Sequence, residues 1–122
     1  MRVLIADNST ALRERLADHL RNLAGVEIVG QAKNVAMARE LSVRLKPDLT
    51  ILDTLDSAGD WIGLLRHLKR SSPGSKVIML TNFVEPENRE MCKRNGADYF
   101  FDKSIEFDKA VAVIRGMQRR AN

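Results

Sequence analysis

The segment Pro47-Asp48-Leu49-Thr50-Ile51-Leu52-Asp53 places a short, largely apolar run between a proline and a carboxylate. The run at 49–52 has the length of a strand and is too short for a helix of the core. It shows almost no polar alternation, as is usual for a strand of a parallel sheet that helices cover on both faces. The segment therefore predicts a central strand whose carboxyl end carries an aspartate.

The same pattern recurs along the chain, where strand-length apolar runs alternate with stretches of helical period. Such strict alternation predicts an α/β fold, with a five-stranded parallel sheet and helices on both faces. The runs at 2–6, 49–52 and 76–80 are apolar enough to be central, and right-handed crossovers favour the strand order 2-1-3-4-5. The expected strands are residues 2–6, 26–31, 49–52, 76–80 and 98–101.

Helix boundaries carry local signals. Asn34 is expected to cap the second helix and Ser104 the fifth, because their side-chain oxygens can accept from free backbone N–H groups. Pro86 suits the first turn of the fourth helix, and Asn95-Gly96 suits its end. Apart from Pro86, only two residues between 85 and 95 are apolar. The fourth helix should therefore bury little surface and open at low cost.

Length and composition restrict the class of protein. With 122 residues, 44% of them hydrophobic, the chain suits one domain over residues 1–122. Its apolar runs are too short for a signal peptide or a membrane span. The single Cys92 suits a reducing compartment. We therefore expect a cytoplasmic protein without membrane contact.

The formal net charge of +4 raises the question of nucleic-acid binding. Most basic residues, however, alternate with carboxylates, as in Arg13-Glu14-Arg15, which is typical of solvated helix faces. The sequence has no zinc-finger spacing and no RNA-binding aromatic motif. Direct DNA binding by this chain is therefore not expected.

Polar side chains of complementary chemistry follow four of the expected strands. Because the carboxyl ends of parallel strands share one edge of the sheet, these side chains should meet there. One such residue alone would be an ordinary turn or cap residue, but four strand ends together indicate a site. The side chains are those of Asp7-Asn8, Asp53, Thr81-Asn82 and Asp102-Lys103.

These groups suit the transfer of a phosphoryl group to a carboxylate. An aspartate can act as a nucleophile and form an acyl phosphate, and we assign that role to Asp53. Asp7 is then a ligand of Mg²⁺, which draws charge off the phosphoryl group and usually takes one or two carboxylates. The Lys103 ammonium and the Thr81 hydroxyl would each contact a phosphoryl oxygen.

Four segments of the chain resemble the receiver domain of bacterial response regulators, a chemotaxis-regulator-like domain of two-component signalling systems. In order and spacing they cover essentially the whole chain. The resemblance implies a flavodoxin-like receiver fold. The segments are Val-Leu-Ile-Ala-Asp7, Pro47-Asp48-Leu-Thr-Ile-Leu-Asp53, Val77-Ile-Met-Leu-Thr81 and Asn95-Gly96-Ala97-Asp98-Tyr-Phe-Phe-Asp-Lys103.

The resemblance also implies a phosphorylated signalling protein that is not an enzyme. Asp53 would receive its phosphoryl group from a histidine kinase or a phosphotransfer protein. An output protein would bind the face formed by the fourth helix, fifth strand and fifth helix, and a homodimer through the same helices is plausible. The implied roles are Mg²⁺ binding for Asp7, Asn8, Asp53 and Leu55, catalysis for Thr81 and Lys103, and switching for Thr81 and Phe100.

The sequence departs from the family pattern in the loops. Asn8 stands where the family usually has a second acidic residue, so weaker Mg²⁺ binding is expected; alternatively, Asn8 caps the first helix. Asp56-Ser57 replaces the usual Met-Pro pair, which makes that loop more acidic. Asp56 could supply a metal ligand or be a solvated turn residue. Trp61 is expected to be buried.

Two apolar residues, Leu55 and Phe83, lie two positions beyond Asp53 and Thr81. In the family, side chains there influence how water reaches the acyl phosphate. Apolar groups should hinder an in-line water molecule, so we predict slow intrinsic dephosphorylation.

Two other classes of function remain open at this stage. The first is a receiver-like adaptor or dimerisation module that works without phosphorylation, which Asn8 and the Asp56-Ser57 loop favour. The second is a flavin or dinucleotide carrier on the same fold. A dinucleotide site needs a glycine-rich turn after the first strand, and Asn8-Ser-Thr-Ala-Leu12 contains no glycine.

Overall fold

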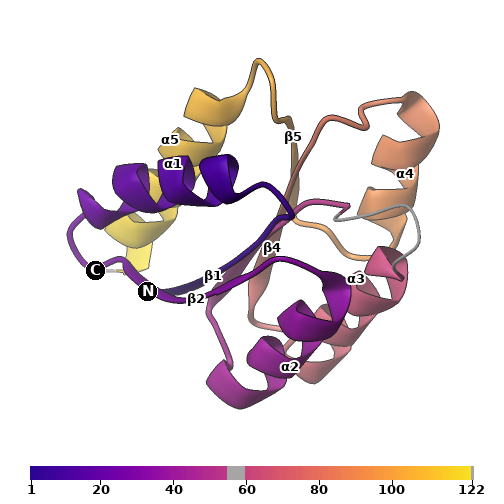
Figure 1. Ribbon diagram of the computed structural model, residues 1–122, viewed down its shortest axis with the longest axis horizontal. Coiled ribbons are helices and arrows are strands. Elements are labelled where there is room, and N and C mark those ends of the chain that lie inside the picture. Colours follow the sequence, from indigo (N-terminus) through magenta and orange to yellow (C-terminus); the bar gives the residue numbers. More distant parts are fainter. Residues whose placement is uncertain (55–59, 122) are drawn as a thin grey trace.

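The computed structural model describes residues 1–54 and 60–121 (Figure 1). Over these residues the strands form one parallel sheet in the order β2-β1-β3-β4-β5, which confirms the predicted fold class and strand order. The strands are β1 (Arg2–Ala6), β2 (Glu27–Ala32), β3 (Leu49–Leu52), β4 (Lys76–Thr81) and β5 (Tyr99–Asp102). The helices are α1 (Thr10–Arg21), α2 (Val35–Leu45), α3 (Trp61–Ser71), α4 (Pro86–Arg94) and α5 (Phe107–Ala121).

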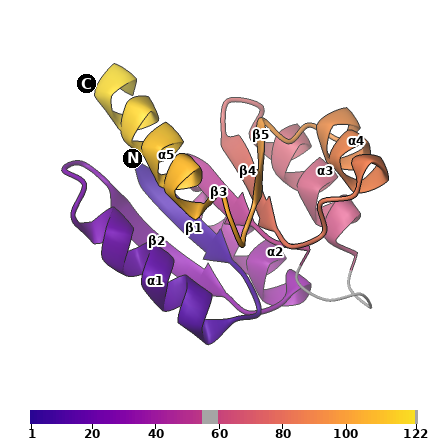
Figure 2. The same ribbon diagram turned by 90° about the horizontal axis from the view of Figure 1, so that it is seen from above.

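Helices cover both faces of the sheet (Figure 2). Val3 and Ile5 of β1 pack with buried residues of α1 and α5. Leu4 and Ala6 of the same strand point the other way and pack with α2, α3 and Cys92 of α4. Because all four of these β1 side chains are fully buried, β1 is covered on both sides, as its apolar sequence predicts.

Two of the predicted helix starts, those at Asn34 and Pro86, follow their local signals. The Asn34 side chain accepts a hydrogen bond from the backbone N–H of Met37, and Pro86 is in the first turn of α4. Ser9 caps α1 through the N–H of Leu12, so the alternative in which Asn8 caps that helix is wrong.

The predicted cap at Ser104 is also wrong. The helix α5 begins at Phe107, and the backbone carbonyl of Glu106 accepts from the N–H of Ala110. The Ser104 hydroxyl instead donates to Asn82 Oδ1 at 2.8 Å, which joins the loop after β5 to the loop after β4. The helix begins three residues after Ser104, so Ser104 is not at the cap position, and its hydroxyl joins two neighbouring strand ends.

The helix α4 is attached to the rest of the molecule by few apolar contacts. Only Cys92 is buried among its residues, as the sequence predicts.

Within the described part of the chain, no helix combines the length and the apolar character that crossing a membrane requires.

Candidate functional site

The backbone fixes the polar side chains that follow the strands. Asp7 donates its N–H to the carbonyl of Ala32, and Asp53 donates its N–H to the carbonyl of Ala6. These bonds continue the parallel ladders just past the ends of β1 and β3. Both aspartates therefore leave the sheet at its carboxyl edge, side by side.

Lys103 joins the two aspartates. Its Nζ lies 2.7 Å from Asp53 Oδ2 and 2.8 Å from Asp7 Oδ2. The side chains of Lys103, Asp7 and Asp53 are 14%, 3% and 8% exposed, so little water shields their charges. Two carboxylates share one ammonium here, which leaves a net negative charge in a buried position.

The environment shifts the pKa of two of these groups. Burial raises the pKa of Asp7, although hydrogen bonds from Lys103 and from the N–H of Ser9 work against it. Burial lowers the pKa of Lys103, but hydrogen bonds to Asp53 and Asp7 outweigh that effect and leave the pKa raised. Lys103 is therefore a fixed positive charge at neutral pH.

Two threonine hydroxyls lie next to the aspartates. Thr81 is fully buried, and its Oγ1 accepts from the N–H of Phe83 at 3.1 Å. Thr54 Oγ1 lies 3.4 Å from Thr81 Oγ1 and 3.5 Å from Asp53 Oδ1. Sequence reasoning did not identify Thr54. The sequence shows only that a residue with a hydroxyl follows the proposed nucleophile. It does not show which way that hydroxyl points.

The negative charge of the two aspartates suits a divalent cation, but few side chains at this edge can act as its ligands. Asp7 and Asp53 supply two adjacent carboxylates, the number that Mg²⁺ usually takes. The Asn8 side chain is exposed at the same edge. No group of three or more His, Cys, Asp or Glu residues is placed to hold a metal ion in the described residues. The predicted ligand Leu55 and the loop residues Asp56-Ser57 lie outside the described residues.

The predicted switch aromatic lies against α4. Phe100 is partly buried beside the cluster that contains Leu64 and Cys92. The guanidinium of Arg89 lies 4.6 Å from the centre of the Phe100 ring.

Trp61, which was expected to be buried, is half-buried and packs against the same cluster.

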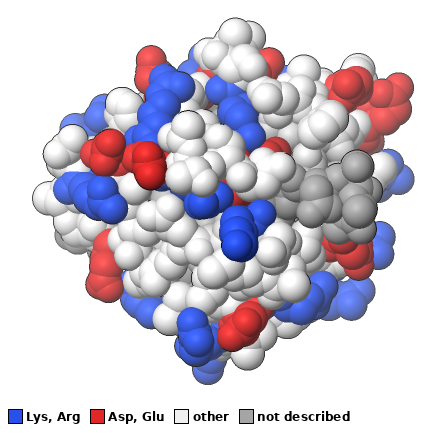
Figure 3. Space-filling view, in the orientation of Figure 1, with Lys and Arg blue, Asp and Glu red and all other residues white. Residues whose placement is uncertain are grey.

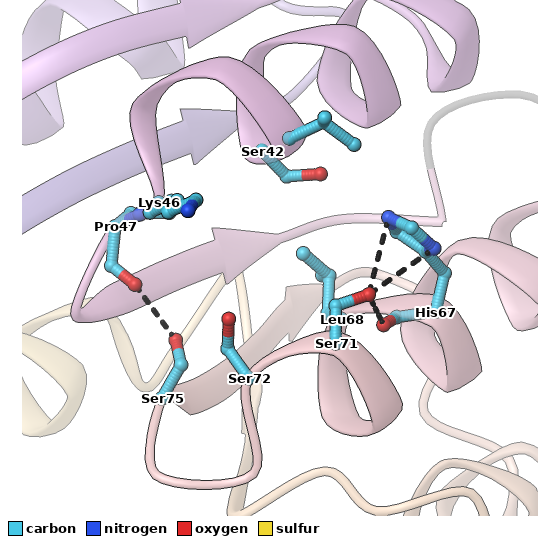
Figure 4. A pocket seen from close by; sticks show the side chains of 9 residues that line it. Ser42, Lys46, Pro47, His67, Leu68, Ser71, Ser72 and Ser75 are labelled. Carbon is cyan, nitrogen blue, oxygen red and sulfur yellow. Dashed lines mark hydrogen bonds between the residues drawn. The ribbon is translucent and has the colours of Figure 1, made fainter.

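A cavity of about 350 Å³ lies between the C-terminal ends of α2 and α3 (Figure 4). Its residues Pro47 and Ser75 precede β3 and β4, so it lies at the opposite edge of the sheet from Asp53. The hydroxyls of Ser71 and Ser75 donate to the carbonyls of His67 and Pro47. This cavity is therefore separate from the cluster of aspartates.

Charge does not gather into one sign on the surface in view. Lys and Arg side chains are interspersed with Asp and Glu over the face that Figure 3 shows. The arrangement is that of a solvated surface, as the alternation of charges in the sequence predicts.

Known proteins match most of the chain. The model of the response regulator receiver domain matches residues 3–115. The response regulator protein VraR of Staphylococcus saprophyticus is 27% identical over 115 residues, which make up 94% of this chain and 55% of VraR. A protein-glutamate methylesterase/protein-glutamine glutaminase of Xanthomonas oryzae is 38% identical over 85 residues, or 70% of this chain and 24% of that protein. The chain thus spans about half of one relative and about a quarter of the other.

Solved structures share the fold. The response regulator domain of Thermotoga maritima CheB aligns with a TM-score of 0.81 at 28% identity, covering 99% of this chain and 95% of that domain. A two-component response regulator from Clostridium difficile aligns with a TM-score of 0.87 at 22% identity, covering 100% and 98%, and supports the fold alone. The strand order, the paired aspartates and the match over residues 3–115 lead to one conclusion: the chain belongs to the response regulator receiver domain family of two-component signalling.

Proposed function

We propose that Asp53 accepts a phosphoryl group from a phosphohistidine of a histidine kinase or phosphotransfer protein. The observation that carries the proposal is the position of Lys103 Nζ, 2.7 Å from Asp53 Oδ2 and 2.8 Å from Asp7 Oδ2. Two buried carboxylates and one ammonium together carry one negative charge. Such a site can bind a divalent cation and then a phosphoryl dianion without a large build-up of positive or negative charge. Positioning and charge compensation are the main requirements of phosphoryl transfer.

In the transfer step, a carboxylate oxygen of Asp53 attacks phosphorus in line with the bond to the imidazole nitrogen. That P–N bond breaks, its electron pair stays on the imidazole, and an acyl phosphate forms. Lys103 then donates to a phosphoryl oxygen, and the Thr81 hydroxyl donates to another. Mg²⁺ bound by Asp7 and Asp53 would supply further charge neutralisation at the phosphoryl oxygens.

The new phosphoryl group would favour a second conformation of the molecule. A change from mostly inactive to mostly active requires a preference of about 5 kcal/mol for the active state. Charge-assisted hydrogen bonds contribute about 1.5–3 kcal/mol each, so the bonds from Lys103 and Thr81 approach that value. Phe100 and the weakly attached α4 would move in response. They would present a changed face of α4, β5 and α5 to an output protein or to a second copy of the chain.

Exposed apolar side chains in the loops after β4 and β5 suit the docking of the phosphodonor. Phe83 is 57% exposed and Ile105 is 81% exposed, and each follows a residue of the Asn82–Ser104 hydrogen bond. These two side chains could contact the protein that carries the phosphohistidine. The proposal places the chain in the cytoplasm and gives it neither a DNA contact nor an enzymatic activity of its own.

The direct test is the intact mass of the protein after incubation with acetyl phosphate and Mg²⁺. The native chain should gain one phosphoryl group, and Asp53→Asn should gain none. Asp18→Asn, which changes a carboxylate that is 75% exposed, is the matched control and should still gain the adduct. An adduct of equal yield in Asp53→Asn would show that another residue is the acceptor.

A second candidate function is an adaptor that works without phosphorylation. It is favoured by the exposed amide of Asn8 and by the presence of only two adjacent carboxylates among the described residues. If the native chain gains no adduct even with excess Mg²⁺, and does not bind beryllofluoride, the adaptor becomes the better assignment.

A further inference from the structure

Thr54 occupies the space between the proposed phosphoacceptor and the proposed switch threonine. The residue is only 6% exposed. Its backbone N–H donates to Asp53 Oδ1 at 2.8 Å, while its hydroxyl lies 3.5 Å from the same oxygen. The hydroxyl also lies 3.4 Å from Thr81 Oγ1. Thr54 therefore contacts both groups, and no role has yet been given to it.

The hydrogen bonds of Thr81 indicate which hydroxyl donates in the contact between Thr54 and Thr81. Its Oγ1 already accepts from the N–H of Phe83, and its own proton still needs an acceptor. The residue is fully buried, so bulk water does not reach it, and leaving the proton unpaired would be costly. A carboxylate is a stronger acceptor than a hydroxyl, so the Thr54 hydroxyl donates to Asp53 Oδ1 at 3.5 Å and can accept from the Thr81 hydroxyl at 3.4 Å.

We infer that Thr54 is a positioning residue that holds the Thr81 hydroxyl in the resting state. A phosphoryl oxygen on Asp53 must then compete with Thr54 Oγ1 for the same proton. The inference rests on the proposed function, because the competition arises only when Asp53 carries a phosphoryl group. Thr54 thereby sets how readily phosphorylation changes the position of Thr81.

Thr54→Val tests this role because valine keeps the shape and the backbone N–H that orients Asp53. Without the competing hydroxyl, the variant should bind beryllofluoride, in the presence of Mg²⁺, about 3- to 10-fold more tightly than the native chain. Thr54→Ser keeps the hydroxyl and should restore the native affinity, which a purely steric role would not predict. Calorimetric titration measures the affinities, and circular dichroism checks that each variant is folded.

The outcomes separate this inference from the proposed function. Native-like or weaker binding by folded Thr54→Val overturns the inference while leaving phosphorylation of Asp53 intact. Absence of beryllofluoride binding by the native chain overturns both. If Thr54→Val does not fold, NMR of the native chain decides the matter. A slowly exchanging Thr81 hydroxyl proton close to Thr54, which shifts when beryllofluoride is added, supports the inference, and its absence overturns it.

Discussion

At position 8 the chain has an amide where the receiver family usually has a second acidic residue. The Asn8 side chain is exposed at the edge of the sheet that carries Asp7 and Asp53. An amide oxygen can coordinate Mg²⁺, but it brings no charge. Asn8 thus leaves a proposed Mg²⁺ site with two carboxylates.

Asn8→Asp should raise the affinity for Mg²⁺ on the order of tenfold, because one added charge near the ion is worth about 1–4 kcal/mol. Calorimetric titration with MgCl₂ measures the change. Asn22→Asp is the matched control, since it adds the same charge at the far end of α1 and should leave the affinity unchanged. Equal affinities for the native chain and Asn8→Asp would mean that Asn8 does not face the ion.

Phe83 should slow the hydrolysis of the acyl phosphate. Its N–H donates to Thr81 Oγ1, which fixes the backbone there, and its apolar side chain is exposed. In Phe83→Ala we expect the phosphoryl group to be lost several-fold faster, because water gains access. Ile105→Ala removes a similar exposed side chain from the other loop and should have little effect. The measurement is the decay of the phosphorylated mass. A lifetime of only seconds in the native chain would contradict the idea.

The helix α4 is held by a few polar contacts at its first turn. Asn88 Nδ2 donates to the carbonyl of Phe83 at 2.6 Å, and Arg89 Nε donates to the carbonyl of Val84 at 3.2 Å. The guanidinium of Arg89 also stacks on Phe100. Because only Cys92 is buried in this helix, these contacts contribute a large part of its attachment.

Arg89→Met should loosen α4 while keeping most of the side-chain volume. The lost cation–π contact is worth about 0.5–1 kcal/mol, so the amides of residues 88–95 should exchange with solvent about 2- to 5-fold faster. Hydrogen exchange followed by mass spectrometry measures this. Arg94→Met, at the exposed C-terminal end of α4, is the control. Unchanged exchange in Arg89→Met would show that other contacts hold the helix.

Burial of the Asp7 carboxylate reduces the stability of the whole molecule. Burial raises the pKa of Asp7 above its ordinary value of 3.8, so the folded protein binds this proton more tightly than the unfolded chain. The free energy of unfolding therefore falls as the pH rises from about 3.8 through the folded-state pKa of Asp7. Above the folded-state pKa of Asp7 the whole cost is present, as is common for groups kept for function.

Asp7→Asn should therefore raise the melting temperature at pH 7 by a few degrees, and the difference should shrink as the pH falls toward 3.8. Thermal unfolding followed by circular dichroism across this pH range measures it. Asp18→Asn, whose carboxylate lies in an exposed pair with Arg21, should change little at any pH. A lower melting temperature for Asp7→Asn at pH 7 would contradict this account.

The amino-acid sequence was enough to predict the strands, their order and the edge at which the polar residues gather. These features depend on periodicity and on where each apolar run stops, as in the run that ends at Asp53, and neighbouring residues carry that information. The exact pairs of atoms at that edge depend on the tertiary structure. In the folded protein, Lys103 lies between both aspartates, and the Thr54 hydroxyl lies next to that of Thr81. The Ser104 hydroxyl, which the sequence suggested as a helix cap, donates to Asn82 instead. Such contacts join residues far apart in the chain, and their direction depends on how adjacent strands align and how the loops between them pack.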